Sequence, residues 1–223
     1  MDDAFSLLRR ATGLLPRDAR IAIGATVEDV HDHERRQDWA FVLDLLLEFG
    51  DEHPLSGEFW SLLAAAARLL MLDGTARWCD WRAGEARDGV IHARLDLLRT
   101  GDGGRRTAFS AQGQLRPLWN IAAAGSKVAT DESLRGEALR DRYGPGGEPE
   151  LRVARLWAED AARPAPGESA TVRLAPLNPG RWRHLAPGDV ITMHEGTPAV
   201  GTATIIQVAP PVEIPARPGD PED

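Results

Sequence analysis

The chain has 223 residues, and its 26 basic and 34 acidic side chains give a formal net charge of −8. This length suits one large or two small domains, and a content of 43% hydrophobic and 27% charged residues is typical of a folded globular chain. The acidity argues against a broad nucleic-acid footprint, because phosphate binding requires clustered Lys and Arg. A single cysteine, Cys79, excludes an intramolecular disulfide and any multi-cysteine metal site.

The start of the chain and its longest apolar run indicate where the protein resides. The Met-Asp-Asp start lacks the basic region of a signal peptide. The longest apolar stretch, 62–72, is interrupted by Arg68 and is shorter than the roughly 20 residues that span a bilayer. We therefore expect a cytoplasmic protein that does not insert into membranes.

The first third of the chain has the apolar spacing of helices. Weaker helical patterns cover about 3–12 and 17–33, and two clearer ones follow. We expect Asp38 to cap the first clear helix, Ser56 to cap the second, and Gly74 to end the second as its C′ residue. The apolar faces of these two helices are Trp39, Val42, Leu43, Leu46 and Leu47, and Phe59, Leu62, Leu63, Ala66 and Leu70. A bundle of four or five helices is predicted.

From Val90 onward the apolar residues alternate, which indicates strands with one solvated face. Further strands are expected at 107–110, 115–121, 150–157, 169–175, 189–194 and 199–208. Short strands separated by Gly- and Pro-containing turns, with no helices between them, favour a closed barrel or a sandwich. The polar stretch 125–149 interrupts this rhythm, and a short helix around 131–142 is expected within it.

The predicted fold class is therefore α+β in two domains. An acidic all-α helical bundle occupies 1–87, and an antiparallel β-barrel with an insertion at about 125–149 occupies 88–208. A Pro-rich acidic tail, 209–223, is expected to be disordered or extended. The helical bundle holds 10 basic and 16 acidic side chains, a net charge of −6. The barrel segment holds 15 basic and 14 acidic side chains, a net charge of +1. The tail holds 1 basic and 4 acidic side chains, a net charge of −3.

Several short motifs follow one another in the second half of the chain in the same order as in a known protein family. GGRRTAF at 103–109 is followed by LRPLW at 115–119, and PGDVI at 187–191 by HEG at 194–196 and VGTA at 200–203. Together they resemble the third domain of translation elongation factor Tu. That resemblance implies a β-barrel, and it implies a surface that helps to hold the T arm of aminoacyl-tRNA.

The chain departs from that family in two respects. The excursion 125–149 is longer than the family's corresponding connection. No Gly-x-x-x-x-Gly-Lys-Ser/Thr motif occurs and the single lysine is Lys127, so GTP hydrolysis is not expected.

A second resemblance lies in the helical half. The segment 34–72, with Asp38-Trp39-Ala40 entering one helix and Pro54-Leu55-Ser56 entering the next, resembles the small MafI-like immunity proteins of bacterial polymorphic toxin systems. That resemblance implies a protein partner for the helical domain.

Three clusters have side chains capable of chemistry, each with a structural alternative. In the run HDHE at 31–34, the two histidines are two residues apart, a spacing that suits a solvated helix end better than a shared metal. His194 and Glu195 suit a general acid or base, or a turn pair. Cys79 suits packing better than reactivity. We expect no cofactor and no metal.

The candidate partner-binding residues are all in the barrel half. Trp182, flanked by Arg181 and Arg183, suits stacking or anchoring of a partner, and equally a lid on the barrel. Arg105, Arg106 and Arg116 are candidates for RNA contact.

These patterns favour a non-enzymatic bacterial protein-interaction module with an immunity or regulatory role. The alternative is a translation-related accessory protein that binds tRNA or a translation factor through the barrel. A third hypothesis is an enzyme with its site at His194 and Glu195, and it requires a deep pocket with a further convergent polar group.

Overall fold

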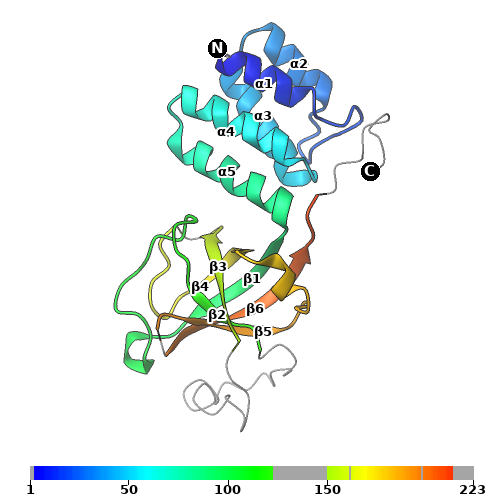
Figure 1. Ribbon diagram of the computed structural model, residues 1–223. Helices are drawn as coiled ribbons and strands as arrows, with labels where there is room; N and C mark the ends of the chain where they lie inside the picture. The colour runs from blue at the N-terminus through cyan, green and yellow to red at the C-terminus, as the bar shows by residue number, and fades with distance from the viewer. Residues whose placement is uncertain (1–2, 123–149, 161, 197, 213–223) are drawn as a thin grey trace. The chain divides into compact units, whose positions relative to one another are not determined.

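The computed structural model describes residues 3–122, 150–160, 162–196 and 198–212. The expected insertion, 125–149, and the tail beyond residue 212 lie outside the described residues. Contacts divide the chain into two compact units, which we call the helical unit (1–87 with 211–223) and the barrel unit (88–210). Figure 1 shows helices in the first and strands in the second, so the predicted α+β class is confirmed.

The helical unit has five helices in the part of the chain that is described. They are α1 (Ala4–Thr12), α2 (Val27–Arg35), α3 (Trp39–Glu52), α4 (Gly57–Leu69) and α5 (Asp73–Asp88). Their apolar faces meet in one core, and several of its members, including Leu8, Leu46 and Leu63, are fully buried. The predicted all-α bundle is therefore confirmed.

Two helix starts follow from local sequence. Thr26 and Asp29 form a capping box at α2, in which the Thr26 N–H donates to Asp29 Oδ2 over 2.8 Å and the Asp29 N–H donates to Thr26 Oγ1 over 3.4 Å. Ser56 caps α4 as predicted, because its Oγ accepts from the Phe59 N–H. Asp38 precedes α3 but makes no side-chain cap; its Oδ2 lies 3.3 Å from His33 Nδ1. The predicted Asp38 cap is therefore wrong.

Two predicted helix limits are also wrong, for reasons of backbone conformation. The helix expected over 17–33 begins only at Val27, because 20–26 folds back through a bridge between Arg20 and Thr26, with Gly24 at φ +86°. Gly74 lies inside α5. Helix α4 ends earlier, because Met71 adopts a left-handed φ of +57° and the next N–H returns to the Ala67 carbonyl.

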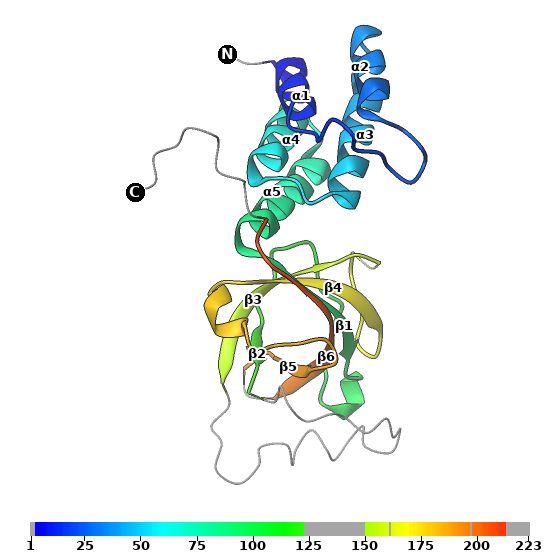
Figure 2. The same cartoon turned by 90° about the vertical axis from the view of Figure 1, so that its right-hand side faces the viewer.

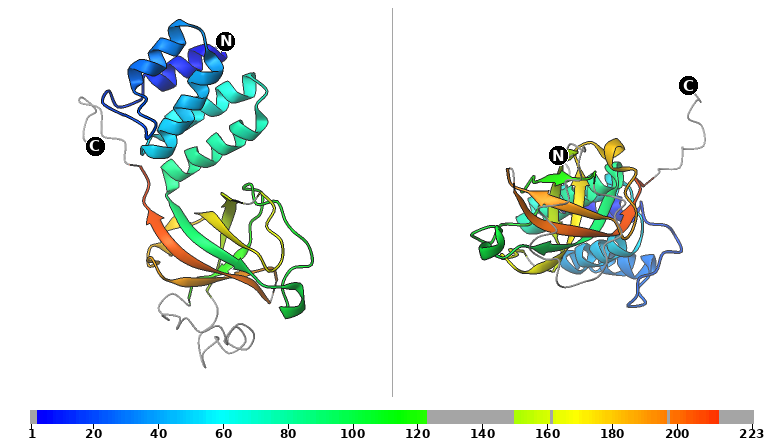
Figure 3. Two further views of the ribbon diagram at one scale, coloured as in Figure 1. Left: turned by 180° about the vertical axis from the view of Figure 1, so that it is seen from behind. Right: turned by 90° about the horizontal axis from the view of Figure 1, so that it is seen from below.

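The barrel unit is a closed, fully antiparallel barrel. Its strands are β1 (Val90–Leu97), β2 (Leu118–Asn120), β3 (Leu151–Ala158), β4 (Ser169–Pro176), β5 (Val190–His194) and β6 (Ala199–Ala209). Their order around the barrel is β1-β4-β3-β2-β5-β6, and β1 closes the ring on β6 with Leu95 opposite Ala203. Figure 2 and the views from behind and below in Figure 3 show this ring. Closure removes free sheet edges.

Side chains along each strand alternate between the barrel interior and its outer face, and the inward ones fill the interior. Ala93 and Leu95 of β1, Trp119 of β2 and Leu156 of β3 are completely buried there. The strand expected at 107–110 is absent from the described residues. That segment is irregular, and the N–H of Phe109 donates to the Pro164 carbonyl instead of joining the main ladder.

Proline shortens the next predicted strand at its start. Pro117 has no N–H to donate, so the strand expected at 115–121 begins at Leu118 and covers three residues.

Candidate partner-binding surfaces

A tight turn after β1 positions Arg105. The short 3-10 helix η1 (Thr100–Asp102) ends at Gly103, which has φ +90°, a conformation that favours glycine. A Cβ on Gly104 would lie 2.1 Å from the Leu98 carbonyl oxygen, so only glycine fits there. Thr100 Oγ1 then donates to the Arg105 carbonyl over 2.7 Å. The Gly-Gly pair therefore fixes the path of the chain into Arg105.

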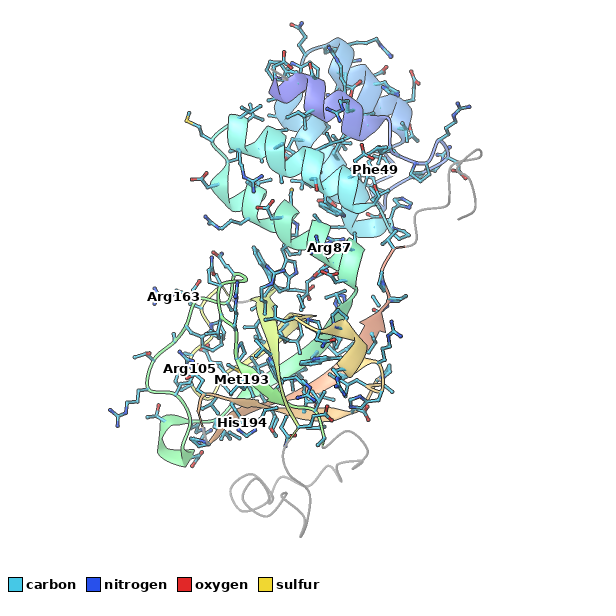
Figure 4. The ribbon with its side chains drawn as sticks, viewed as in Figure 1. Phe49, Arg87, Arg105, Arg163, Met193 and His194 are labelled. Carbon is cyan, nitrogen blue, oxygen red and sulfur yellow. The ribbon has the colours of Figure 1, made fainter. Side chains whose placement is uncertain are left out.

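The Arg105 side chain is committed inside the barrel unit. It forms an ion pair with Glu195 of the β5–β6 turn, and its guanidinium lies 4.6 Å from the centre of the Phe109 ring. Only 16% of the side chain is exposed, and this burial lowers the pKa of Arg105. Figure 4 labels it beside the barrel. Arg105 thus joins two distant turns, and contact with a phosphate would compete with Glu195.

His194 and Glu195 are adjacent in sequence but contact different groups. His194 is 2% exposed, and its Nε2 lies 2.8 Å from Thr192 Oγ1 on the same strand. Figure 4 labels it on β5 next to Met193. Glu195 is exposed and pairs with Arg105. The described contacts therefore hold this pair as part of the barrel wall and its turn.

Trp182 lies in the barrel core. It belongs to the 3-10 helix η3 (Pro179–Trp182), is 2% exposed and packs in the same cluster as Leu185. Its Nε1–H has no hydrogen-bond partner in the described part of the chain. The flanking Arg181 and Arg183 are exposed. The ring is therefore part of the barrel core, while the two arginines are exposed.

Three further arginines of the barrel unit are exposed. Arg106 and Arg116, both singled out from the sequence, form no ion pair within the described residues. Arg163, which is labelled in Figure 4, is also exposed. The carbonyl of the next residue, Pro164, accepts the Phe109 N–H. Sequence reasoning missed Arg163, because no motif signals the pairing of 109–111 with 162–164.

The run at 31–34 uses its side chains for local pairing. His31 Nδ1 lies 3.1 Å from Glu34 Oε2, while the other oxygen of Glu34 accepts from Thr12 Oγ1 over 2.7 Å. His33 turns instead toward Asp38. The two imidazoles thus reach different carboxylates, and within the described ranges no group of three or more His, Cys, Asp or Glu side chains converges on a common point.

Cys79 packs within the helical unit. Its side chain is completely buried in the core cluster, and that burial raises the pKa of the thiol to about 12. A neutral, buried thiol is a poor nucleophile at physiological pH.

Apolar side chains on the surface are concentrated in the helical unit. Ten large hydrophobic side chains are exposed among the described residues, and seven belong to this unit. The seven are Phe5, Leu14, Ile23, Phe41, Leu69, Met71 and Leu72. The apolar periodicity of the sequence did not predict these exposed residues. When a helix has apolar residues on more than one face, the periodicity does not show which face will remain exposed.

A hollow of about 480 Å³ lies between the start of α4 and the end of α5. Its charged lining residues are Glu58 and Arg87, and Arg87 is labelled in Figure 4. Val212 also lines it, and the Val212 N–H donates to the Ala86 carbonyl over 2.8 Å. The last described residue of the chain is therefore part of the helical unit.

Comparison with known proteins gives no family assignment. No protein-family model matches the chain, and no curated protein is similar to it in sequence. Among the described residues, no helix combines the length and apolar character needed to cross a bilayer.

Proposed function

We propose that this chain is a non-enzymatic bacterial protein-interaction module, in which the acidic helical unit binds a protein partner in an immunity or regulatory role. The observation that carries the proposal is the combination of charge and exposed apolar surface in one unit. Residues 1–87 hold 10 basic and 16 acidic side chains, a net charge of −6, and the same unit has seven exposed large apolar side chains. An acidic surface attracts a basic partner, and exposed apolar side chains on the same unit offer contacts to it.

The contacts of the candidate catalytic groups support a non-enzymatic role. Glu195 is paired with Arg105, His194 is covered, and the Cys79 thiol is buried with a raised pKa. The closed antiparallel barrel agrees with the resemblance to the third domain of elongation factor Tu, and the helices agree with the MafI-like resemblance. A resemblance of fold alone carries no activity.

A retention experiment tests the proposal. The full chain is immobilised and exposed to lysate of its native bacterium at low salt, about 0.05 M, and then washed at about 0.5 M. We expect a protein retained in stoichiometric amount at low salt and released at high salt, because screening shortens the reach of the acidic surface. Recovery of no stoichiometric protein at low salt contradicts the proposal.

The alternative is binding of tRNA or a translation factor through the barrel. The observation in its favour is that Arg106 and Arg116 are exposed and form no ion pair within the described residues. If it holds, aminoacyl-tRNA binds the chain with a steep salt dependence, and Arg106→Ala with Arg116→Ala reduces the salt slope by about 1 per lost phosphate contact. Absence of tRNA binding at low salt removes tRNA as the ligand.

A further inference from the structure

The outward face of α3 forms a straight stripe of exposed side chains. Phe41, Asp44, Glu48 and Glu52 are all exposed, and their spacing of three and four residues places them on one side of the helix. We call these four residues the α3 stripe. At a rise of 1.5 Å per residue, the stripe runs for about 16 Å.

Each end of the α3 stripe has an exposed apolar side chain. At the first end, Phe41 is 44% exposed, and its ring centre lies 4.2 Å from that of His33. At the other end, both carboxylate oxygens of Glu52 accept from the Ala22 N–H, over 2.9 and 2.8 Å. The residue after Ala22 is Ile23, which is 74% exposed. Glu52 therefore holds the backbone of the loop that carries Ile23 at the far end of the stripe.

A second contact fixes the loop that presents Ile23. His53 Nε2 lies 2.8 Å from the Arg20 carbonyl oxygen. The preceding Ile21 is 4% exposed and packs in the core of the helical unit. The residues just before Ile23 are thus attached to the helical unit, and after it the Gly24 N–H donates to the Ile21 carbonyl over 2.7 Å, so the exposed position of Ile23 follows from the fold.

Two carboxylates of the α3 stripe have no partner in the part of the chain that the structure describes. Glu52 is engaged by the Ala22 N–H, and the neighbouring Asp51 forms an ion pair with Arg82. Asp44 and Glu48 form neither a hydrogen bond nor an ion pair within the described residues. An apolar partner would have to strip water from both carboxylates without compensation, which is costly. A partner with cations between two apolar groups would avoid this cost, because its cations would pair with the two carboxylates.

We propose that the α3 stripe, together with Ile23, is the docking face for a basic segment of the partner protein. That segment has Lys or Arg opposite Asp44 and Glu48, between apolar side chains that contact Phe41 and Ile23. The inference rests on the proposed function and adds the surface and the chemistry of the partner. A second copy of this chain does not fit, because a two-fold contact of identical stripes opposes like charges.

The test combines cross-linking with a matched pair of charge variants. A photo-reactive p-benzoylphenylalanine replaces Phe41, and in a second variant Ile23, in the full chain expressed in its native bacterium. We expect cross-links to a partner peptide with a net positive charge. With that partner purified, Asp44→Asn plus Glu48→Gln weakens binding by about 2- to 30-fold, from 0.2–1 kcal/mol per exposed charge pair.

The control variant is Glu58→Gln plus Asp73→Asn, which makes the same change in charge at two exposed carboxylates of α4 and α5. We expect its affinity for the partner to stay within about 2-fold of the original, because neither site belongs to the α3 stripe. Circular dichroism at 222 nm verifies that all variants stay folded.

The outcomes separate this inference from the proposed function. Cross-links only to a second copy of the chain, cross-links to a neutral or acidic segment, or equal weakening by the two charge variants overturn the docking face. If the unmodified chain retains a stoichiometric partner but neither position cross-links, the docking face is wrong and the proposed function stands. If no partner is retained at all, both fail.

Discussion

Replacement of Gly50 by alanine is the sharpest test of how the helical unit is packed. Gly50 lies inside α3 and is buried, and a Cβ built there would lie 2.4 Å from Cη2 and Cζ2 of the Trp60 indole. Carbon atoms in contact normally stay about 3.5–4.0 Å apart, so the overlap exceeds 1 Å. Trp60 is 1% exposed, edge-on to Phe59 and stacked under the Arg82 guanidinium at 4.3 Å, so the indole has little room to move.

Two opposing effects set the size of the loss. Gly→Ala inside a helix gains about 1 kcal/mol in propensity, while overpacking of a rigid core costs about 1–3 kcal/mol. With an overlap this large against a rigid ring we take the upper end, and expect Gly50→Ala to lower the free energy of unfolding by about 2 kcal/mol. For a unit of this size, that lowers Tm by roughly 8–16 °C.

The assay is urea unfolding followed by circular dichroism at 222 nm, which reports the helical unit because the described α-helices belong to it. The matched control is Gly74→Ala, at a helical position where a Cβ meets nothing within 4 Å. The control is expected to be neutral or up to about 1 kcal/mol more stable. The reasoning is refuted if Gly50→Ala is as stable as the original chain. Adding Trp60→Phe should cost less in the Gly50→Ala background than alone, since the two residues are in contact.

Three further predictions concern groups in both units. The Cys79 thiol, with its pKa raised to about 12, should react with a disulfide reagent at pH 8 only as fast as the chain unfolds; full labelling of the folded protein within seconds would contradict its burial. Hydrogen bonds from Thr26 lower the pKa of Asp29, so its contribution is present above the ordinary pKa of 3.8 and is lost as pH falls through the folded pKa. The gap in urea midpoint between the original chain and Asp29→Asn should therefore close in acid; a constant gap argues against the capping box. Arg105→Ala should lower barrel stability, read by amide hydrogen exchange of the barrel strands, by about 1–3 kcal/mol, whereas Arg106→Ala should change it by less than about 0.5; equal effects would refute the Glu195 contact.

The helix caps show how far local sequence predicts local structure. Ser56 caps α4 because its hydroxyl needs only the N–H three residues later, a contact that the sequence itself specifies. Asp38 has the same chemistry, but its carboxylate lies beside His33. Met71 takes the left-handed turn that was expected at Gly74, although glycine adopts that conformation more easily. Local rules therefore predict a set of possible ends, and packing selects among them.

The candidate surfaces were less predictable than the fold. Trp182 and its flanking arginines form one motif in the sequence, yet the ring is buried while Arg181 and Arg183 are exposed. Arg105 and Arg106 are neighbours, yet Arg105 is paired with Glu195 and Arg106 is exposed. The sequence does not distinguish a buried arginine from an exposed one, because the burial of each side chain depends on residues far away in the chain.

The sequence by itself determined the two classes of structure and their charges. A helical period before about residue 87 and an alternating one after it were enough for the α+β class, because each period follows from backbone geometry alone. Only the tertiary structure decided which charged groups remain free. Glu52 holds Ala22, and Arg105 holds Glu195, through contacts between distant segments. Asp44 and Glu48 stay unpaired between two exposed apolar side chains because no described segment folds over them.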